Sequence, residues 1–218
     1  MGNNAYVGRN AVAIGNNSNA VGKYGTAVGS NSNAVSSFST AFGSRANAEG
    51  VSATAIGSNA QATGGFSTAL GYFSRASGTG SLAFGNGTDA SGYSAMAIGQ
   101  GTTAAGVHSI AQGYEANVGA YGYNAIAIGT QSSATAYAST ALGKNSAATG
   151  DSSVAVGTTT VASGEYGTAV GPFAVATGQS ATALGDTANA LGDNSTAIGG
   201  SAYASGTGAS ALGYNAQA

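Results

Sequence analysis

A 14-residue period runs through the chain and constrains its fold more than any other feature. Almost every period contains an Ala, a large apolar residue and a Gly in sequence, as in Ala13-Ile14-Gly15 and Ala27-Val28-Gly29. This Ala, taken as position 1, recurs fifteen times: Ala13, Ala27, Ala41, Ala55, Ala69, Ala83, Ala97, Ala111, Ala127, Ala141, Ala155, Ala169, Ala183, Ala197 and Ala211. One step, from Ala111 to Ala127, takes 16 residues instead. Because a fixed period is typical of repeat architectures, we expect a single repeat domain over residues 1–218, with an irregular coil near 112–126.

The pattern within each period predicts two short β-strands and two turns. Position 8 is almost always Ala, whereas position 7 is usually polar, so positions 6, 8 and 10 should face inward and positions 7 and 9 should face water. A second strand runs from position 13 to position 3, with Thr and the large apolar residue on one side and small residues on the other. A helical array would contain far less than the 38 glycines of this chain. Glycines at positions 3 and 10 are expected to supply positive φ at the turns.

The chain is therefore expected to be all-β, a slender parallel β-solenoid with one period per coil. Stacked coils lie about 4.8 Å apart, so fifteen of them would extend roughly 70 Å. Each coil supplies about one large apolar side chain, and so thin a roll is expected to self-associate. The position-2 residues either fill the roll or meet across subunits. We favour the roll interior, which places Phe42 and Phe84 in the core.

Composition excludes several classes of function. The net charge is −2, and five Lys and Arg residues cannot form a phosphate-binding stripe, so no nucleic-acid partner is expected. The absence of cysteine excludes disulfides, thiolate chemistry and zinc–sulfur sites. No apolar run approaches the roughly 20 residues of a membrane-spanning helix, so no direct membrane insertion of this segment is expected.

The sequence offers no set of residues suited to catalysis. His108 is the only histidine, it falls at a turn position, and its nearest following carboxylate is Glu115. A catalytic or metal site needs convergent titratable groups, so His108 is interpreted as a surface residue. The acidic residues occur singly rather than in a calcium-binding repeat. We expect a protein that is not an enzyme and that has no catalytic residue, cofactor or metal.

Aromatic residues at variable turn and outward positions are the best candidates for ligand contact. Exposed Tyr and Phe give contact area at low entropic cost and are enriched in recognition surfaces. The alternative is that they pack against neighbouring coils or subunits. The inserted residues make the stretch from Tyr114 to Tyr123 the favoured patch. The full set of ligand-contact candidates is Tyr72, Phe73, Tyr93, Tyr114, Tyr121, Tyr123 and Tyr137.

The repeat resembles the head domains of trimeric autotransporter adhesins of the YadA-like type. The segment Asn194-Ser195-Thr196-Ala197-Ile198-Gly199, followed by Ala202-Tyr203-Ala204-Ser205-Gly206, is similar to one copy of their head repeat. The resemblance covers essentially the whole chain. Departures from the repeat are Gln112 at position 2, Ser36 and Ala136 at position 10, and the insertion near 118–121.

The resemblance implies a left-handed parallel β-roll that assembles as a side-by-side homotrimer. It also implies a place on the bacterial cell surface, as the head portion of an outer-membrane-anchored protein. Its expected partners are extracellular-matrix proteins or host cell surfaces, and its expected roles are attachment and bacterial self-adhesion. Similar repeats occur in phage tail fibres, so a structural shaft segment of such a fibre is an alternative. An ice-binding solenoid, suggested by the Thr row at position 14, is a weaker one because Leu82, Met96 and Ile110 interrupt the row.

Overall fold

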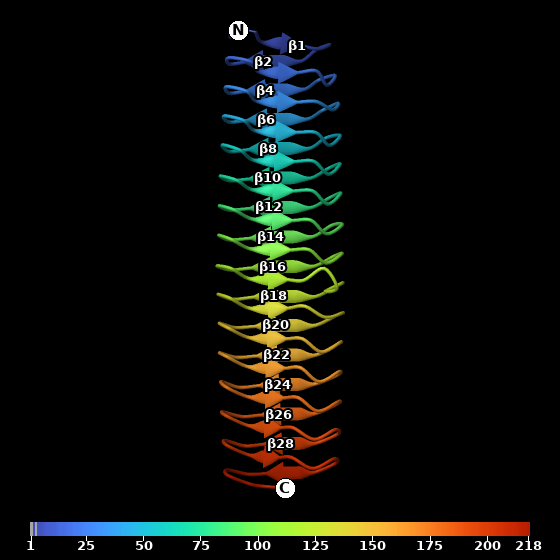
Figure 1. Cartoon of the computed structure of the whole chain (residues 1–218), viewed down its shortest axis with the longest axis vertical. Helices are drawn as coiled ribbons and strands as arrows, with labels where there is room; N and C mark the ends of the chain where they lie inside the picture. The colour runs from blue at the N-terminus through green and yellow to red at the C-terminus, as the bar shows by residue number, and fades with distance from the viewer. Residues whose placement is uncertain (1, 3) are drawn as a thin grey trace. The chain divides into compact units, whose positions relative to one another are not determined.

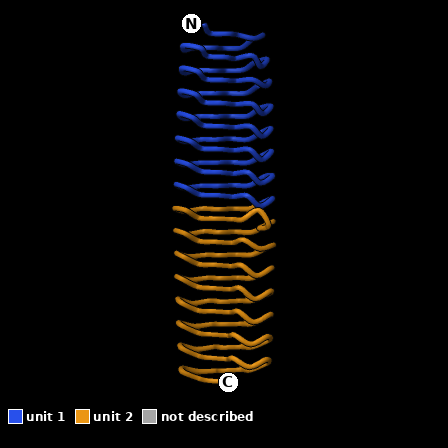
Figure 2. Tube along the Cα trace, viewed as in Figure 1, with its two compact units in different colours: residues 1–108 blue, residues 109–218 orange. Residues whose placement is uncertain are grey.

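The computed structural model describes residue 2 and residues 4–218. It comprises two compact units, unit 1 (residues 1–108, blue in Figure 2) and unit 2 (residues 109–218, orange). Each unit is a stack of coils, and each coil passes through two parallel sheets, A and B, as Figure 1 shows. The parallel β-solenoid predicted from the repeat is confirmed. Nowhere in the described residues is there a helix that could cross a membrane.

In unit 1 the two sheets alternate along the chain. Sheet A contains β1 (Tyr6–Val7), β3 (Asn19–Ala20), β5 (Asn33–Ala34), β7 (Asn47–Ala48), β9 (Gln61–Ala62), β11 (Arg75–Ala76), β13 (Asp89–Ala90) and β15 (Thr103–Ala104). Sheet B contains β2 (Val12–Ile14), β4 (Thr26–Val28), β6 (Thr40–Phe42), β8 (Thr54–Ile56), β10 (Thr68–Leu70), β12 (Leu82–Phe84) and β14 (Met96–Ile98).

Unit 2 repeats the same arrangement. Sheet A contains β17 (Asn117–Val118), β19 (Ser133–Ala134), β21 (Ala147–Ala148), β23 (Val161–Ala162), β25 (Val175–Ala176), β27 (Asn189–Ala190) and β29 (Tyr203–Ala204). Sheet B contains β16 (Ile110–Gln112), β18 (Ile126–Ile128), β20 (Thr140–Leu142), β22 (Val154–Val156), β24 (Thr168–Val170), β26 (Thr182–Leu184), β28 (Thr196–Ile198) and β30 (Ser210–Leu212).

Strand pairing follows the sequence period. Thr68 of β10 pairs with Thr54 of β8, so equivalent residues of successive coils lie side by side. Ala111 of β16 pairs with Ala127 of β18, which shows that the 16-residue coil keeps the register of the sheets. Its extra residues therefore lie in a turn rather than in a strand.

The core of each coil consists of small side chains. The alanines at positions 1 and 8, such as Ala69 and Ala76, are fully buried, and so are most residues at positions 6 and 13. Most buried serines donate their hydroxyl to a nearby carbonyl, as Ser32 Oγ does to the oxygen of Gly29 at 2.9 Å. No hydrogen-bond partner among the described residues is present for the hydroxyls of Ser81, Ser153 and Ser195. The interior is narrow because small residues occupy both facing strands of every coil, and the backbone ladders, rather than bulky side chains, fill its cross-section.

The prediction that the position-2 residues fill the roll is wrong. Phe42 and Phe84 are 54% and 49% exposed, and the whole row points out of sheet B. The reason is the alternation of a β-strand, in which neighbouring side chains point to opposite faces. Once the alanine at position 1 lies in the core, the large residue at position 2 must lie outside.

The glycine prediction is confirmed at one position and wrong at the other. Gly29, at position 3, has φ of 134°, a conformation that an L side chain rarely adopts. Position-10 glycines such as Gly50 do not have positive φ; instead, a Cβ on Gly50 would overlap the carbonyl of Gly64 in the next coil. Close approach of backbones is therefore what requires glycine there. Position 12 supplies the left-handed residue of that turn, as at Tyr24 (φ 61°) and Phe66 (φ 57°).

The 16-residue coil combines its insertion with a larger core residue. Val118 takes the place of the position-8 alanine and is fully buried. A Cβ on Gly122 would lie 2.6 Å from Val118 Cγ1, so the widened turn closes directly over this side chain. The two extra residues, Ala120 and Tyr121, are both exposed. They lengthen the path of the chain around the larger valine.

Candidate functional site

The outward side of sheet B forms a continuous row of large apolar side chains in each unit, here called the apolar face. In unit 1 it contains Ile14, Val28, Phe42, Ile56, Leu70, Phe84 and Ile98 at position 2. In unit 2 the same position holds Ile128, Leu142, Val156, Val170, Leu184, Ile198 and Leu212, with Gln112 as the polar exception. A row of exposed apolar side chains that runs through a whole unit is typical of protein–protein contact sites.

The outward side of sheet A, here called the polar face, differs between the units. In unit 1 it carries an amide ladder, in which Asn19 Nδ2 donates to Asn33 Oδ1 and Asn33 Nδ2 to Asn47 Oδ1, both at 3.0 Å. Further along, Arg75 and Asp89 form an ion pair at 3.8 Å. In unit 2 the equivalent row includes Ala147, Val161 and Val175.

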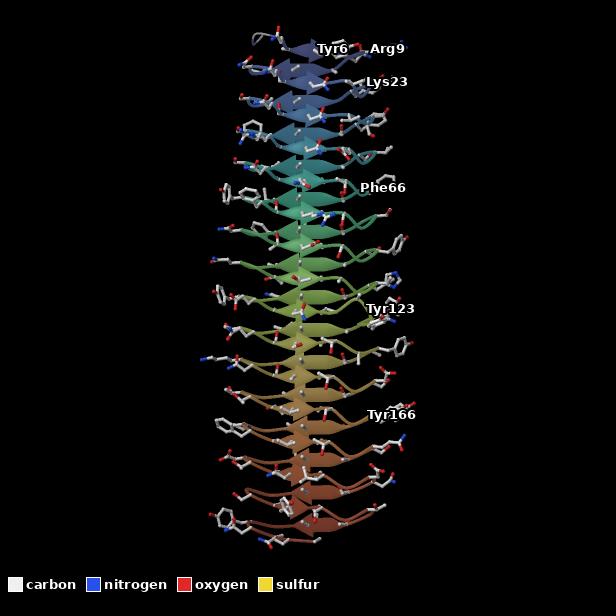
Figure 3. The ribbon with its side chains drawn as sticks, in the orientation of Figure 1. Tyr6, Arg9, Lys23, Phe66, Tyr123 and Tyr166 are labelled. Carbon is white, nitrogen blue, oxygen red and sulfur yellow. The ribbon has the colours of Figure 1, made fainter. Side chains whose placement is uncertain are left out.

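The turns form two edges at opposite ends of the strands, visible on either side of the ribbon in Figure 3. The first-turn edge, positions 4 and 5, links each sheet B strand to the next sheet A strand. The second-turn edge, positions 9 to 12, leads back to sheet B. In unit 1, Figure 3 shows Arg9, Lys23 and Phe66 on the second-turn edge, and in unit 2 it shows Tyr123 and Tyr166 there.

The seven predicted contact residues do not form one patch. All are exposed, from Tyr123 at 45% to Tyr121 at 80%. The first-turn edge carries Tyr72 and Phe73 in unit 1 and Tyr114 in unit 2, whereas the second-turn edge carries Tyr93 in unit 1 and Tyr121, Tyr123 and Tyr137 in unit 2. Tyr114 is thus separated from Tyr121 and Tyr123 by the width of the coil.

Some of these aromatic side chains contact each other. Tyr72 and Phe73 meet edge to face, with ring centroids 4.4 Å apart. Tyr93 lies 5.5 Å from the ring of His108, which is exposed as predicted. These contacts join neighbouring turn residues and leave most of each ring open to solvent.

Sequence reasoning did not select a second aromatic group, on the second-turn edge of unit 1. Tyr24 and Phe38 stack with centroids 5.1 Å apart and planes 18° from parallel, and Lys23 Nζ lies 4.9 Å from the Tyr24 ring centre. Phe66 is the most exposed of this group, at 69%. All three rings sit on left-handed residues, a conformation that disfavours bulky side chains. The signal in the sequence was an aromatic residue at position 12 in three of four successive periods, with Ser52 as the exception.

Charge also differs between the units on this edge. At position 11, unit 1 carries Arg9 and Lys23, whereas unit 2 carries Asp151, Glu165 and Asp193, all exposed. Glu165 accepts a hydrogen bond from the Tyr166 hydroxyl, and this bond, aided by the negative charge, raises the pKa of that phenol. Glu115 raises the pKa of Tyr114 in the same way on the opposite edge. Both phenols therefore remain neutral donors around pH 7.

The described residues offer surfaces for binding rather than an enclosed site. They contain no pocket and no group of three or more His, Cys, Asp or Glu residues able to hold a metal ion. The exposed surfaces of the molecule are faces and edges that repeat from coil to coil. Such surfaces suit extended partners or further copies of the same fold.

Comparison with known proteins agrees with this architecture. The family model of the YadA head domain repeat, which spans two copies of the repeat, matches residues 7–32, 34–60, 62–88, 90–116, 120–146, 148–174, 176–202 and 204–218. The crystal structure of the collagen-binding domain of the Yersinia adhesin YadA is similar at 22% identity and a TM-score of 0.18. That similarity covers 79% of this chain and 64% of the solved domain. No curated protein sequence matches the chain.

The eight matched segments follow one another along almost the entire sequence, and the break between 116 and 120 falls in the 16-residue coil. The match thus reflects the coil period itself rather than one short motif. The chain belongs to the YadA head domain family.

Proposed function

We propose that this chain is the head segment of a bacterial surface adhesin that attaches to an extracellular-matrix protein or a host cell surface and supports self-adhesion between bacteria. The observation that carries the proposal is the family match along nearly every coil. The protein acts by binding and not by catalysis. As part of an outer-membrane-anchored protein, it is displayed outside the cell.

The active form is a homotrimer of chains lying side by side. The apolar face supports this assembly, because Ile14, Phe42 and Phe84 each expose about half of their surface in the single chain. Burying such a row against other copies removes apolar area from water at roughly 25 cal/mol per Å². The turn edges are then the surfaces on which a ligand binds.

The ligand contacts are the exposed aromatic residues of the turn edges. The group Tyr121, Tyr123 and Tyr137 is the densest, because the insertion adds Tyr121 beside two tyrosines at position 11 of successive coils. The peptide groups below them are joined, with Ala138 N donating to the oxygen of Tyr123 at 2.8 Å. Rigid tyrosines on an ordered backbone give contact area with little loss of entropy.

Binding of the full chain to immobilised collagen and to other matrix proteins tests the proposal, with collagen first because the similar solved domain is a collagen-binding one. We expect saturable binding that weakens about tenfold when Tyr121, Tyr123 and Tyr137 are changed to Ser, an effect of about 1.4 kcal/mol. Tyr203→Ser, on the polar face, is the matched control and should bind as the wild type does. Absence of binding to matrix proteins and to cell surfaces alike would contradict the proposal.

A further inference from the structure

The second-turn edges of the two units carry opposite charges. Arg9 and Lys23 occupy position 11 in successive coils of unit 1, and Asp151 and Glu165 occupy it in successive coils of unit 2. All four side chains are exposed. The two rows therefore have complementary sign and the same spacing of one coil, about 4.8 Å.

Backbone hydrogen bonds hold each row in line. Tyr24 N donates to the oxygen of Arg9 at 3.1 Å, and Tyr166 N donates to the oxygen of Asp151 at 2.9 Å. These bonds repeat from coil to coil along the turn, as between Ser152 N and the oxygen of Tyr137 at 2.7 Å. The spacing of the side chains is thus fixed by the solenoid rather than by flexible loops.

Neither row is neutralised within the chain. The acidic row accepts hydrogen bonds from uncharged groups: Tyr137 N on Asp151 Oδ1 at 3.1 Å, Gln179 Nε2 on Glu165 Oε2 at 3.2 Å, and the Tyr166 hydroxyl on Glu165. Among the described residues, ion pairing is confined to Arg75 and Asp89 on the polar face. Like charges one coil apart lie well within the screening length of about 8 Å at physiological salt and repel each other. A row of the opposite sign relieves that repulsion.

Uncharged residues continue the two rows at position 11. In unit 1 the coils after Lys23 carry Ser37 and then Val51, whereas in unit 2 the coils before Asp151 carry Tyr137 and then Tyr123. If the edges run in opposite directions, pairing Lys23 with Asp151 brings Ser37 to Tyr137 and Val51 to Tyr123. If they run in the same direction, Ser37 meets Gln179 and Val51 meets Asp193. The antiparallel arrangement therefore places Val51 against an aromatic ring rather than against a charge.

We propose that the second-turn edge of unit 1 binds the second-turn edge of unit 2 of another copy, antiparallel, with Arg9 beside Glu165 and Lys23 beside Asp151. This inference rests on the proposed adhesive function and names the surface that mediates self-adhesion. Exposed ion pairs are individually weak and screened by salt. The contact therefore holds when many copies are displayed together, as on a cell surface, where linked sites raise the effective concentration.

Charge reversal tests this contact on the full chain attached to beads. Wild-type beads should aggregate at low salt and disperse at high salt. Beads carrying Arg9→Glu with Lys23→Glu, or Asp151→Lys with Glu165→Lys, should each lose aggregation at least tenfold. Mixing the two variant beads should restore it, because the acidic unit 1 edge of the first then faces the basic unit 2 edge of the second.

Matched controls lie on the first-turn edge. Arg45→Glu and Asp186→Lys each reverse one charge there, and each should leave aggregation within about twofold. Failure of the mixed beads to aggregate, or equal loss in the controls, would overturn the proposed contact. The mass of each variant at high salt, and its binding to collagen, report separately on the trimer and on matrix attachment.

Discussion

The two sides of sheet B use opposite kinds of apolar residue. On the inner side Ala69 is fully buried, and on the outer side its neighbours Thr68 and Leu70 remain partly exposed. In an ordinary sheet the large residues would face the core and small or polar ones the solvent. In this chain the small residues face the core and the large ones face the solvent. Each coil is therefore held by backbone hydrogen bonds between strands and by packing of small residues, whereas its large side chains are available to other molecules.

Of the changes considered, enlarging a buried residue on the inner side of sheet B should lower the stability of the chain most. Ala69→Leu inserts three carbon atoms between strands whose facing residues are already in contact, and overpacking of this kind costs about 3 kcal/mol. We expect a clear fall in the thermal unfolding midpoint. Thr68→Leu is the matched control, because Leu82 already occupies the equivalent outward position in the next coil. Equal destabilisation by both changes would mean that the two sides of sheet B do not differ as described.

Reducing Val118, the largest fully buried side chain among the described residues, should have a smaller effect on stability. Val118→Ala removes two methyl groups from a fully buried site and should cost about 1–2 kcal/mol. Removing Ala120 and Tyr121 in the same variant restores a 14-residue coil and should return most of that stability. Chemical denaturation gives the free energy of unfolding of the wild type, of Val118→Ala and of the combined variant. If removing Ala120 and Tyr121 alone were harmless, the insertion would not serve to accommodate Val118.

Changes on the apolar face should leave the stability of the single chain almost intact. Ile56→Ser, Leu70→Ser and Phe84→Ser affect side chains that are partly exposed already, so each should cost about 0.5 kcal/mol or less. Urea unfolding at low protein concentration checks this. A loss comparable to that of Ala69→Leu would place these side chains in the core.

The smallest effect concerns the titration of the turn edges. Glu165→Gln removes the carboxylate whose hydrogen bond and negative charge raise the pKa of Tyr166, so this pKa should fall toward its ordinary value. A raised pKa favours the protonated phenol in the folded chain. The contribution of this phenol to folding stability is present below pH 10 and is lost as pH rises through the folded pKa. Because Tyr166 and Glu165 are both exposed, this contribution to the free energy of unfolding is small, and unfolding at pH 7 should change little. An absorbance titration follows the phenol, with Glu115→Gln and Tyr114 as the parallel pair.

The sequence was sufficient to predict the strands, their parallel pairing and the coil period, because one pattern repeats at a fixed interval. It did not decide which apolar residues lie inside. Periodicity places Ala69 and Leu70 on opposite faces but does not say which face is the core. The decisive clue was that positions 1 and 8 are both small in almost every coil, so that facing strands can approach closely.

The candidate surfaces were only partly predictable. Exposed aromatic residues could be selected from their variable positions, but their division between two edges depends on which turn each one occupies. Tyr114 and Tyr123 are close in sequence yet lie at opposite ends of the strands. The opposite charges of Arg9 and Asp151 become meaningful only when both are seen at position 11 of the same kind of turn.

The central claim is that the large side chains of sheet B face outward and are covered by other copies of the chain. Light scattering of the full chain over a dilution series tests it most directly, with the variant carrying Ile56→Ser, Leu70→Ser and Phe84→Ser measured beside it. The account predicts three times the mass of one chain for the wild type, persisting on dilution, and a folded single chain for the variant. A wild type that remains a stable monomer at every concentration would contradict it.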